Sequence, residues 1–129
     1  LRGSALAPVV MRAPPERVGR YLAAADIGLA FRADSFSVQG VAPVKLGEYL
    51  LCGVPAVGNA AVGDTSAARA AGLFFDDKAG VDAAAQWLVE DVLPRREAYR
   101  ERARQAGVEG FSLRRSVEDY LAAIAAMRV

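Results

Sequence analysis

The chain has 129 residues, of which 53% are apolar, 24% are charged and 8% are aromatic. This length and composition allow one globular domain and exclude a disordered, collagen-like or multi-domain protein. Sixteen Lys and Arg residues against fifteen Asp and Glu residues give a net charge of +1, which is too small for a nucleic-acid or polybasic membrane binder. We therefore expect no nucleic-acid partner, and any bound anion must be held by a local arrangement of groups.

The counts of cysteine and histidine exclude several kinds of chemistry. The single cysteine, Cys52, rules out an internal disulfide, and the absence of histidine removes His-based zinc sites and His-based catalytic triads. Without a histidine to activate it, Cys52 is expected to fill space rather than act as a nucleophile. Asp76 and Asp77 lack further oxygen ligands at suitable spacing, so they predict a solvated turn and no metal site.

Nothing in the sequence predicts a membrane segment. No apolar run approaches the roughly 18 residues that a spanning helix needs. The first residues lack the charged and apolar order of a signal peptide. We therefore expect a cytoplasmic protein without a membrane span.

The first part of the chain alternates apolar runs with an amphipathic segment. Residues 6–11 (LAPVVM) predict a buried strand of a parallel sheet. The spacing of apolar residues over 15–25 predicts a helix with one side packed on the sheet. A second buried strand is predicted at 27–31 (IGLAF), and a loop rich in Ser, Asp and Gly follows over 32–43.

The rest of the chain continues this alternation and then becomes mostly helical. Pro43 predicts the start of a helix over 44–51, and Gly53 lies where a left-handed C-terminal cap is needed. Further strands are predicted at 54–58 and 72–75, a turn at 59–64, and helices at 65–71, 83–92, 94–106 and 113–128, the last with Ser112 as its N-cap. Strands that alternate with helices predict an α/β fold, with a parallel sheet, right-handed crossovers and helices on both faces.

Two groups of side chains in the helical part carry structural expectations. Trp87, Tyr99 and Tyr120 occupy apolar positions of the predicted helices and are expected in the core. The five arginines between Arg95 and Arg104 are interleaved with glutamates. They predict a solvated helix face with ion pairs at helical spacing, with an anion-binding patch as the alternative.

The most informative stretch joins the loop over 32–43 to the helix that follows it. A strand, a loop and a helix N-terminus in this order place main-chain N–H groups at the carboxyl end of a parallel strand, where the helix dipole favours a phosphate. Lys45, Glu48 and Cys52 are spaced at i, i+3 and i+7, which puts them on one stripe of the helix. Lys45 and Glu48 therefore face the same space, and spacing alone also allows an exposed ion pair between them.

Two segments resemble the C-terminal domain of retaining GT-B glycosyltransferases of the family 4 type. They read ADIGL over 25–29 and PVKLGEYLLCGVPAV over 43–57. In that family an Ala-Asp-apolar strand leads through a loop to a helix reading K-L-x-E-Y, which is followed by a glycine and a P-V-V strand. The similarity continues in GLFF over 72–75 and in Phe111-Ser112 before the terminal helix, so the resemblance covers most of the chain.

The resemblance implies a Rossmann-like domain that binds the nucleotide diphosphate sugar of a glycosyltransferase. The ribose-binding carboxylate would be Glu48, because an ionised carboxylate can accept from both hydroxyls of a cis-diol. The family's loop contacts with donor phosphates and sugar carry over to Val41, Ala42 and Ser37. Lys45 faces the same site. The resemblance also implies no metal, no cofactor and no nucleophile from this chain, because GT-B enzymes stabilise the leaving diphosphate with basic side chains and a helix N-terminus.

The chain departs from the family pattern in two respects. Many relatives carry an acidic residue eight positions before the helix glutamate, where this chain has Gly40. Gly40 would therefore meet the donor through its main chain alone. The units that carry the pyrophosphate-binding Arg and Lys, and the N-terminal acceptor domain, are also missing. We therefore expect residues 1–129, which lack a starting Met, to be a single α/β domain, the distal part of a donor-binding domain, inactive by itself.

Two other functions are compatible with the sequence. One is a non-catalytic α/β binding or interaction module, either a degenerate relative or a flavodoxin-like domain. The other is a nucleotide-sugar epimerase of the same fold. Because the units expected before residue 6 are missing, we also expect an exposed apolar sheet edge or face, and a homo-oligomer formed through it.

Overall fold

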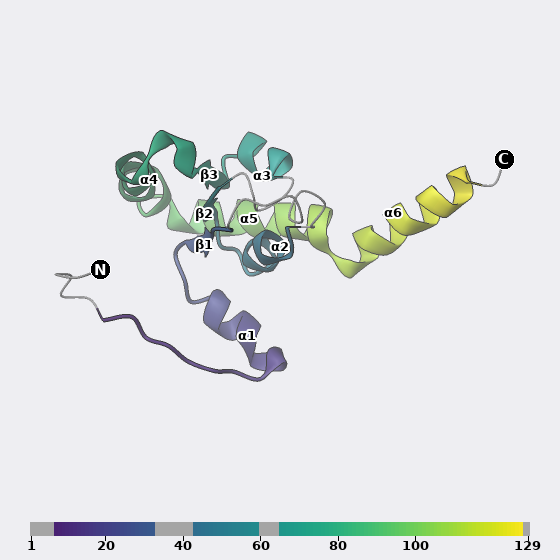
Figure 1. Cartoon of the computed structure of the whole chain (residues 1–129), viewed down its shortest axis with the longest axis horizontal. Coiled ribbons are helices and arrows are strands. Elements are labelled where there is room, and N and C mark those ends of the chain that lie inside the picture. Colours follow the sequence, from purple (N-terminus) through teal and green to yellow (C-terminus); the bar gives the residue numbers. More distant parts are fainter. Residues whose placement is uncertain (1–6, 33–42, 60–64, 128–129) are drawn as a thin grey trace.

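A computed structural model describes residues 7–32, 43–59 and 65–127 (Figure 1). In chain order the helices and strands are α1 (Pro15–Leu22), β1 (Gly28–Ala30), α2 (Val44–Leu51), β2 (Ala56–Gly58), α3 (Ser66–Ala70), β3 (Phe74–Asp76), α4 (Val81–Trp87), α5 (Arg96–Phe111) and α6 (Leu113–Ala126). A 3-10 turn, η3 (Asp77–Ala79), precedes α4, and a π-helical turn, η4 (Leu88–Val92), follows it. The six predicted helices and the strands predicted at 27–31, 54–58 and 72–75 are confirmed, with shifted boundaries. Within these described ranges, no helix is long and apolar enough to cross a membrane.

The three strands form one parallel sheet with the order β1-β2-β3. The register aligns their carboxyl ends, so that Ala30, Gly58 and Asp76 lie side by side. A helix lies in each connection, α2 between β1 and β2 and α3 between β2 and β3, because parallel strands need a crossover. The fold class is therefore α/β, as predicted, with a small sheet.

Residues of β1 alternate between the two faces of the sheet. Gly28 lies against the ring of Tyr49 in α2, and Ala30, on the same face, is buried. Leu29 points to the opposite face, where it lines a groove together with Val57 and residues of α4. The period of two along a strand produces this alternation. The sheet therefore has α2 on one face and α4 on the other.

The core lies between the sheet, α2 and α5. Leu46 and Leu50, one turn apart on α2, are fully buried. α5 packs closely along α2 at Gly107, where a Cβ would lie 2.5 Å from the main-chain nitrogen of Leu51. After α2 the chain turns at Gly53, whose φ of 76° confirms the predicted left-handed cap. The buried apolar cluster consists of Ala30, Leu46, Leu50, Ala56, Ala68, Leu73, Phe74, Val92, Tyr99 and Ala103.

Arg100 ties α5 to the segment that follows α1. Its guanidinium donates to the carbonyl oxygens of Ala23 at 2.8 Å and Ala25 at 3.1 Å. The next residue, Asp26, forms a salt bridge with Arg96, with 2.9 Å between Oδ1 and Nε. Carbonyls at and beyond a helix C-terminus lack an intrahelical partner, so a cation that donates to them satisfies these acceptors and complements the helix dipole.

Arg104 and Arg102 likewise donate to main-chain carbonyls at the C-terminal ends of α2 and α3. Arg104 donates to the carbonyl oxygen of Leu51 at 2.8 Å, and Arg102 donates to the carbonyl oxygen of Ala71. Arg102 and Arg104 are exposed, as predicted, but within the described ranges they do not form the predicted ion pairs at helical spacing. They bind main-chain carbonyls because α5 passes the C-terminal ends of α1, α2 and α3.

The N-terminal segment differs most from the sequence-based expectation. The strand predicted at 6–11 is wrong for residues 7–11, which form no strand, while residue 6 lies outside the described residues. Val9 and Val10 are 83% and 90% exposed. α1 packs chiefly against α2 and none of its residues is buried, whereas the sequence predicted a side packed on the sheet. Residues 7–11 lie away from the edge of β1 (Figure 1). An apolar run without a neighbouring strand has no main-chain partner and stays unpaired.

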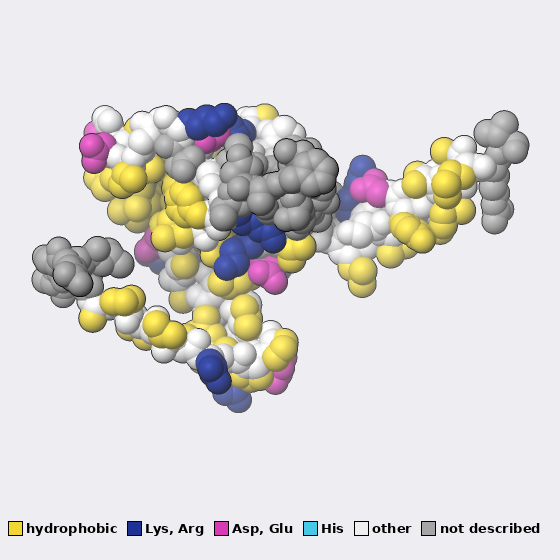
Figure 2. Space-filling model, in the orientation of Figure 1, with side chains coloured by type: hydrophobic (Ala, Val, Ile, Leu, Met, Phe, Trp, Pro, Cys, Tyr) yellow, Lys and Arg dark blue, Asp and Glu magenta, His cyan; other side chains and the backbone are white. Residues whose placement is uncertain are grey.

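α6 extends away from the rest of the molecule (Figure 1). Ser112 caps it as predicted, since its hydroxyl accepts from the N–H of Arg115 at 3.2 Å. Apolar side chains lie exposed along the helix (Figure 2). Tyr120 is among them at 69% exposure, so its predicted burial is wrong, whereas Tyr99 is buried and Trp87 packs against the core. Helical spacing identified an apolar face, but no described element covers it.

Candidate functional site

The candidate site lies at the carboxyl edge of the sheet, where α2 begins. Pro43 is the N-cap of α2, and its side chain makes no capping hydrogen bond. The first turn of α2 contains Lys45 and no acidic residue, so the partial positive charge of the helix N-terminus is not offset there. The other four residues predicted to contact a donor, Ser37, Gly40, Val41 and Ala42, precede this turn and lie outside the described residues.

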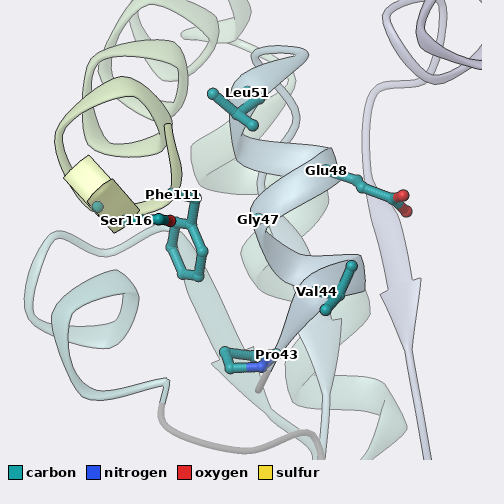
Figure 3. Close-up of a pocket in the computed structure, with 8 residues that line it drawn as sticks. Pro43, Val44, Gly47, Glu48, Leu51, Phe111 and Ser116 are labelled. Carbon is teal, nitrogen blue, oxygen red and sulfur yellow. The ribbon is translucent and has the colours of Figure 1, made fainter. Parts of the chain in front are cut away.

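Lys45 and Glu48 lie on the exposed side of α2. In the part of the chain that the structure describes, neither side chain forms an ion pair, with the other or with a third residue. In Figure 3 the carboxylate of Glu48 projects away from Phe111. A lysine that precedes its glutamate is the less favourable order for a helical pair. Both charges are therefore open to a ligand.

A groove of about 410 Å³ lies beside the first two turns of α2 (Figure 3). Phe111, at the end of α5, forms one wall, and Ser116 of α6 also lines the groove. A Cβ on Gly47 would lie 2.6 Å from Cδ1 of Phe111. The glycine in the word K-L-G-E-Y therefore lets Phe111 approach α2. Glu48 lies at the margin of this groove.

Tyr49 fixes α2 against β1. A Cβ on Gly28 would lie 2.4 Å from Cδ2 of the tyrosine ring, and the hydroxyl donates to the carbonyl oxygen of Leu29 at 3.1 Å. The N–H of Gly28 bonds to Pro55 across the sheet at 2.8 Å, so the peptide groups of Leu29 point to the outer edge of β1. Tyr49 thereby sets the position of α2, and Glu48 precedes it on the exposed side.

Asn59 and Arg32 join the carboxyl ends of β2 and β1. The side chain of Asn59 accepts from the N–H of Arg32 at 3.1 Å, and its Nδ2 donates to the carbonyl oxygen of Arg32 at 2.7 Å. The side-chain amide thus takes the place of a strand residue and extends the ladder past the last paired residues, Ala30 and Gly58. Sequence reasoning assigned Asn59 to a turn and Arg32 to a loop and missed the pair. An asparagine directly after a buried strand was the available signal.

Asp76 is held in place at the carboxyl end of β3. Its Oδ1 accepts from the N–H of Lys78 at 3.0 Å, and its Oδ2 lies 2.6 Å from Nη2 of Arg69 in α3. The hydrogen bond from Lys78 and the charge of Arg69 lower the pKa of Asp76, against the opposing effect of burial. Asp76 therefore anchors α3 to β3. The described residues contain no group of three or more Cys, Asp or Glu that could hold a metal ion.

Cys52 lies at the C-terminal end of α2 and is half-buried. Burial raises the pKa of its thiol, Arg104 lowers it and Glu48 raises it further. A thiol with a raised pKa is mostly protonated at neutral pH, and the thiolate is the nucleophile. This environment agrees with the interpretation of Cys52 as a space-filling residue.

Comparison of the chain with protein-family models, with curated proteins and with solved structures found no match. What this chain binds is therefore inferred from the groups at the carboxyl edge of its sheet. These are the exposed carboxylate of Glu48, the uncapped N-terminus of α2 with Lys45, and Arg32 held by Asn59.

Proposed function

We propose that this chain is the distal part of the nucleotide-sugar-binding domain of a retaining GT-B glycosyltransferase of the family 4 type. The full enzyme would transfer a sugar from a nucleotide diphosphate sugar to an acceptor. The observation that carries the proposal is the position of Glu48. Its exposed carboxylate, unpaired among the described residues, lies in the second turn of a helix that begins at the carboxyl edge of a parallel sheet. Ligands of open α/β sheets bind at this edge.

The ribose and the diphosphate of such a donor each have a matching group on the chain. Glu48 accepts hydrogen bonds from the two ribose hydroxyls. The N-terminus of α2 and Lys45 attract the phosphates. The same positive charges stabilise the nucleoside diphosphate as it leaves, so this chain supplies electrostatic stabilisation and no nucleophile. The acceptor and further basic groups would come from other parts of the enzyme.

A non-catalytic interaction module is the second candidate. A groove of about 420 Å³ is lined by apolar residues of β1, of its two flanking positions and of α4, among them Ile27, Leu29, Phe31 and Val81. Leu29 is 61% and Phe31 is 52% exposed. Contiguous exposed apolar surface commonly marks a protein contact. A chain that binds no nucleotide would favour this second function.

Substitution of Glu48 tests the proposal. Glu48→Gln keeps the size of the side chain, removes its charge and replaces one acceptor oxygen with a donor. A hydrogen bond to a charged group contributes roughly 1.5 to 3 kcal/mol. The affinity for UDP, GDP or ADP, each measured in turn by calorimetry, should therefore fall about tenfold to a hundredfold. Glu101→Gln, on the exposed side of α5, is the matched control and should leave the affinity unchanged. An equal affinity for wild type and Glu48→Gln would contradict the assignment.

Assays of the full-length enzyme separate the possible reactions. We expect transfer to persist in excess chelator, because the leaving diphosphate is stabilised by N–H groups and basic side chains. Loss of turnover that added magnesium or manganese restores would contradict this expectation. Product analysis distinguishes a transferase from an epimerase. A transferase moves the sugar to an acceptor, whereas an epimerase changes the stereochemistry of the sugar.

A further inference from the structure

Arg32 continues the alternation of β1 past the end of the strand. Leu29 and Phe31 both line the apolar groove on the α4 side of the sheet. Gly28 and Ala30 face α2 instead. The next residue in this alternation, Arg32, therefore falls on the α2 side of the carboxyl edge. α2 begins at this same edge, because it leads from the carboxyl end of β1 back to the start of β2.

Asn59 holds both polar main-chain groups of Arg32, at 3.1 and 2.7 Å. This fixes the position of the arginine Cα and the direction in which its side chain leaves the backbone. Any residue except proline would supply the same N–H and carbonyl, so the contact with Asn59 does not require a cation at position 32. The Arg32 side chain is exposed, and its guanidinium pairs with no carboxylate within the described ranges. Among the described residues, the main chain of Arg32 is therefore held in place while its guanidinium has no ionic partner.

The charges at this edge follow an order along α2. Arg32 and Lys45 lie on the side where the helix begins, and Glu48 lies about one turn further along. A nucleoside diphosphate has the same order of groups, with negative phosphates at one end and a ribose diol beyond them. Arginine suits the phosphate end because its guanidinium donates two parallel hydrogen bonds to phosphate oxygens.

We infer that Arg32 is a further ligand-binding residue, which contacts the diphosphate of the nucleotide, and that Asn59 is its positioning residue. The inference rests on the proposed function, in which Glu48 binds the ribose. It assigns to the diphosphate a cation that neither the family resemblance nor the spacing of the sequence motifs identified. Because Asn59 fixes the backbone of Arg32 before the ligand arrives, less conformational entropy is lost on binding.

Binding of ligand fragments to the full chain tests the role of Arg32. The probes are a nucleoside diphosphate (UDP, GDP and ADP in turn), the corresponding nucleoside and inorganic pyrophosphate. Arg32→Gln should weaken binding of the diphosphate and of pyrophosphate about tenfold or more and leave the nucleoside unaffected. Glu48→Gln should weaken the nucleoside and the diphosphate and leave pyrophosphate unaffected. Arg17→Gln, an exposed arginine of α1, removes the same charge and should change none of the three affinities.

A double-mutant cycle tests the positioning role of Asn59. Asn59→Ala should weaken pyrophosphate binding when Arg32 is present and have no further effect in the Arg32→Gln background, because the two residues act as one unit. A merely structural role would lower the affinity by the same factor in both backgrounds, and that result would overturn the positioning role. Urea unfolding of each variant shows whether the fold is retained.

The outcomes separate this inference from the proposed function. Nucleoside diphosphate binding that depends on Glu48 and not on Arg32 supports the proposed function and overturns the inference. Pyrophosphate binding that depends on Arg32, without any effect of Glu48→Gln on the nucleotide, supports the anion contact and overturns the ribose assignment. Binding of none of the probes at millimolar concentration overturns both.

Discussion

Tyr49 occupies the space that a side chain at position 28 would need. A Cβ on Gly28 would lie 2.4 Å from the tyrosine ring, and the tyrosine hydroxyl donates to Leu29 at 3.1 Å. The sequence segments ADIGL and KLGEY are therefore in contact in the folded protein. Their glycine and tyrosine hold α2 on β1, and this leaves Glu48 on the exposed side of the helix.

Gly28→Ala should destabilise the protein. The added methyl group would overlap the ring of Tyr49, and overpacking of a well-packed site costs about 1–3 kcal/mol in the free energy of unfolding. Gly110→Ala in α5 is the matched control, because a Cβ there meets no atom within 4 Å. This control should be neutral or stabilising by up to about 1 kcal/mol. Urea unfolding measures both changes, and an unchanged stability of Gly28→Ala would contradict the packing of Tyr49 on β1.

Arg100→Ala should lower the free energy of unfolding by about 1–3 kcal/mol, because it leaves the carbonyls of Ala23 and Ala25 without their charged donor. Arg100→Lys should lose most of the same stability, because one ammonium cannot reproduce the two directed bonds of a guanidinium. The control is Arg114→Ala. The side chain of Arg114 is 89% exposed, and its removal breaks one helical ion pair worth roughly 0.3–0.5 kcal/mol. If Arg100→Ala and Arg114→Ala were equally stable in thermal unfolding, the proposed capping of α1 would be wrong.

Asp76 should make stability depend on pH at the acid end. Its pKa is lowered in the folded protein, chiefly by the N–H of Lys78 and also by Arg69, so the folded state holds the proton less tightly than the unfolded state. The stabilising contribution is therefore complete above the unfolded pKa of about 4 and is lost as the pH falls through the lower folded value. Asp76→Asn should be less stable than wild type at pH 7, and the difference should shrink in acid. The exposed Asp82→Asn is the control, and a difference for Asp76→Asn that does not vary with pH would contradict this account.

The exposed apolar face of β1 should cause the chain to associate. Leu29 and Phe31 leave apolar surface beside α4 uncovered, and such surface favours contact with another molecule. Light scattering at micromolar concentration should therefore report a dimer or a larger assembly. Leu29→Glu should shift the protein toward the monomer, whereas Val108→Glu, on a half-exposed position of α5, should not. A wild-type monomer across this range would refute association, and an assembly unaffected by Leu29→Glu would place it on another surface.

Most of the secondary structure was determined by the sequence, because its signals act within a few residues. Pro43 before α2, Gly53 after it and Ser112 before α6 mark helix ends that the structure confirms. Apolar runs also predicted β1, β2 and β3. The same kind of run failed at residues 7–11, because a strand needs a partner as well as apolar residues.

For the candidate site, the sequence predicted the helix that carries Lys45 and Glu48 and their position on its exposed side. It did not predict which distant groups join them. Asn59 binds the backbone of Arg32 because the parallel register brings the carboxyl ends of β1 and β2 together, although the two residues are 27 positions apart in the sequence. These contacts depend on the direction in which whole elements cross, and no local pattern encodes that direction.

The arginines of α5 show the same difference between what local sequence patterns predict and what the tertiary structure sets. Their spacing equally allowed local ion pairs, which is what the sequence indicated, and contacts to other helices. Arg100 reaches α1 across 77 residues and Arg104 reaches Leu51 across 53, because α5 packs against the C-terminal ends of α1 and α2. Sequence periodicity determined which residues share a face of a helix. Only the tertiary structure decided what that face meets, because the packing of buried apolar side chains sets how the helices cross and thereby selects the partner of each exposed charge.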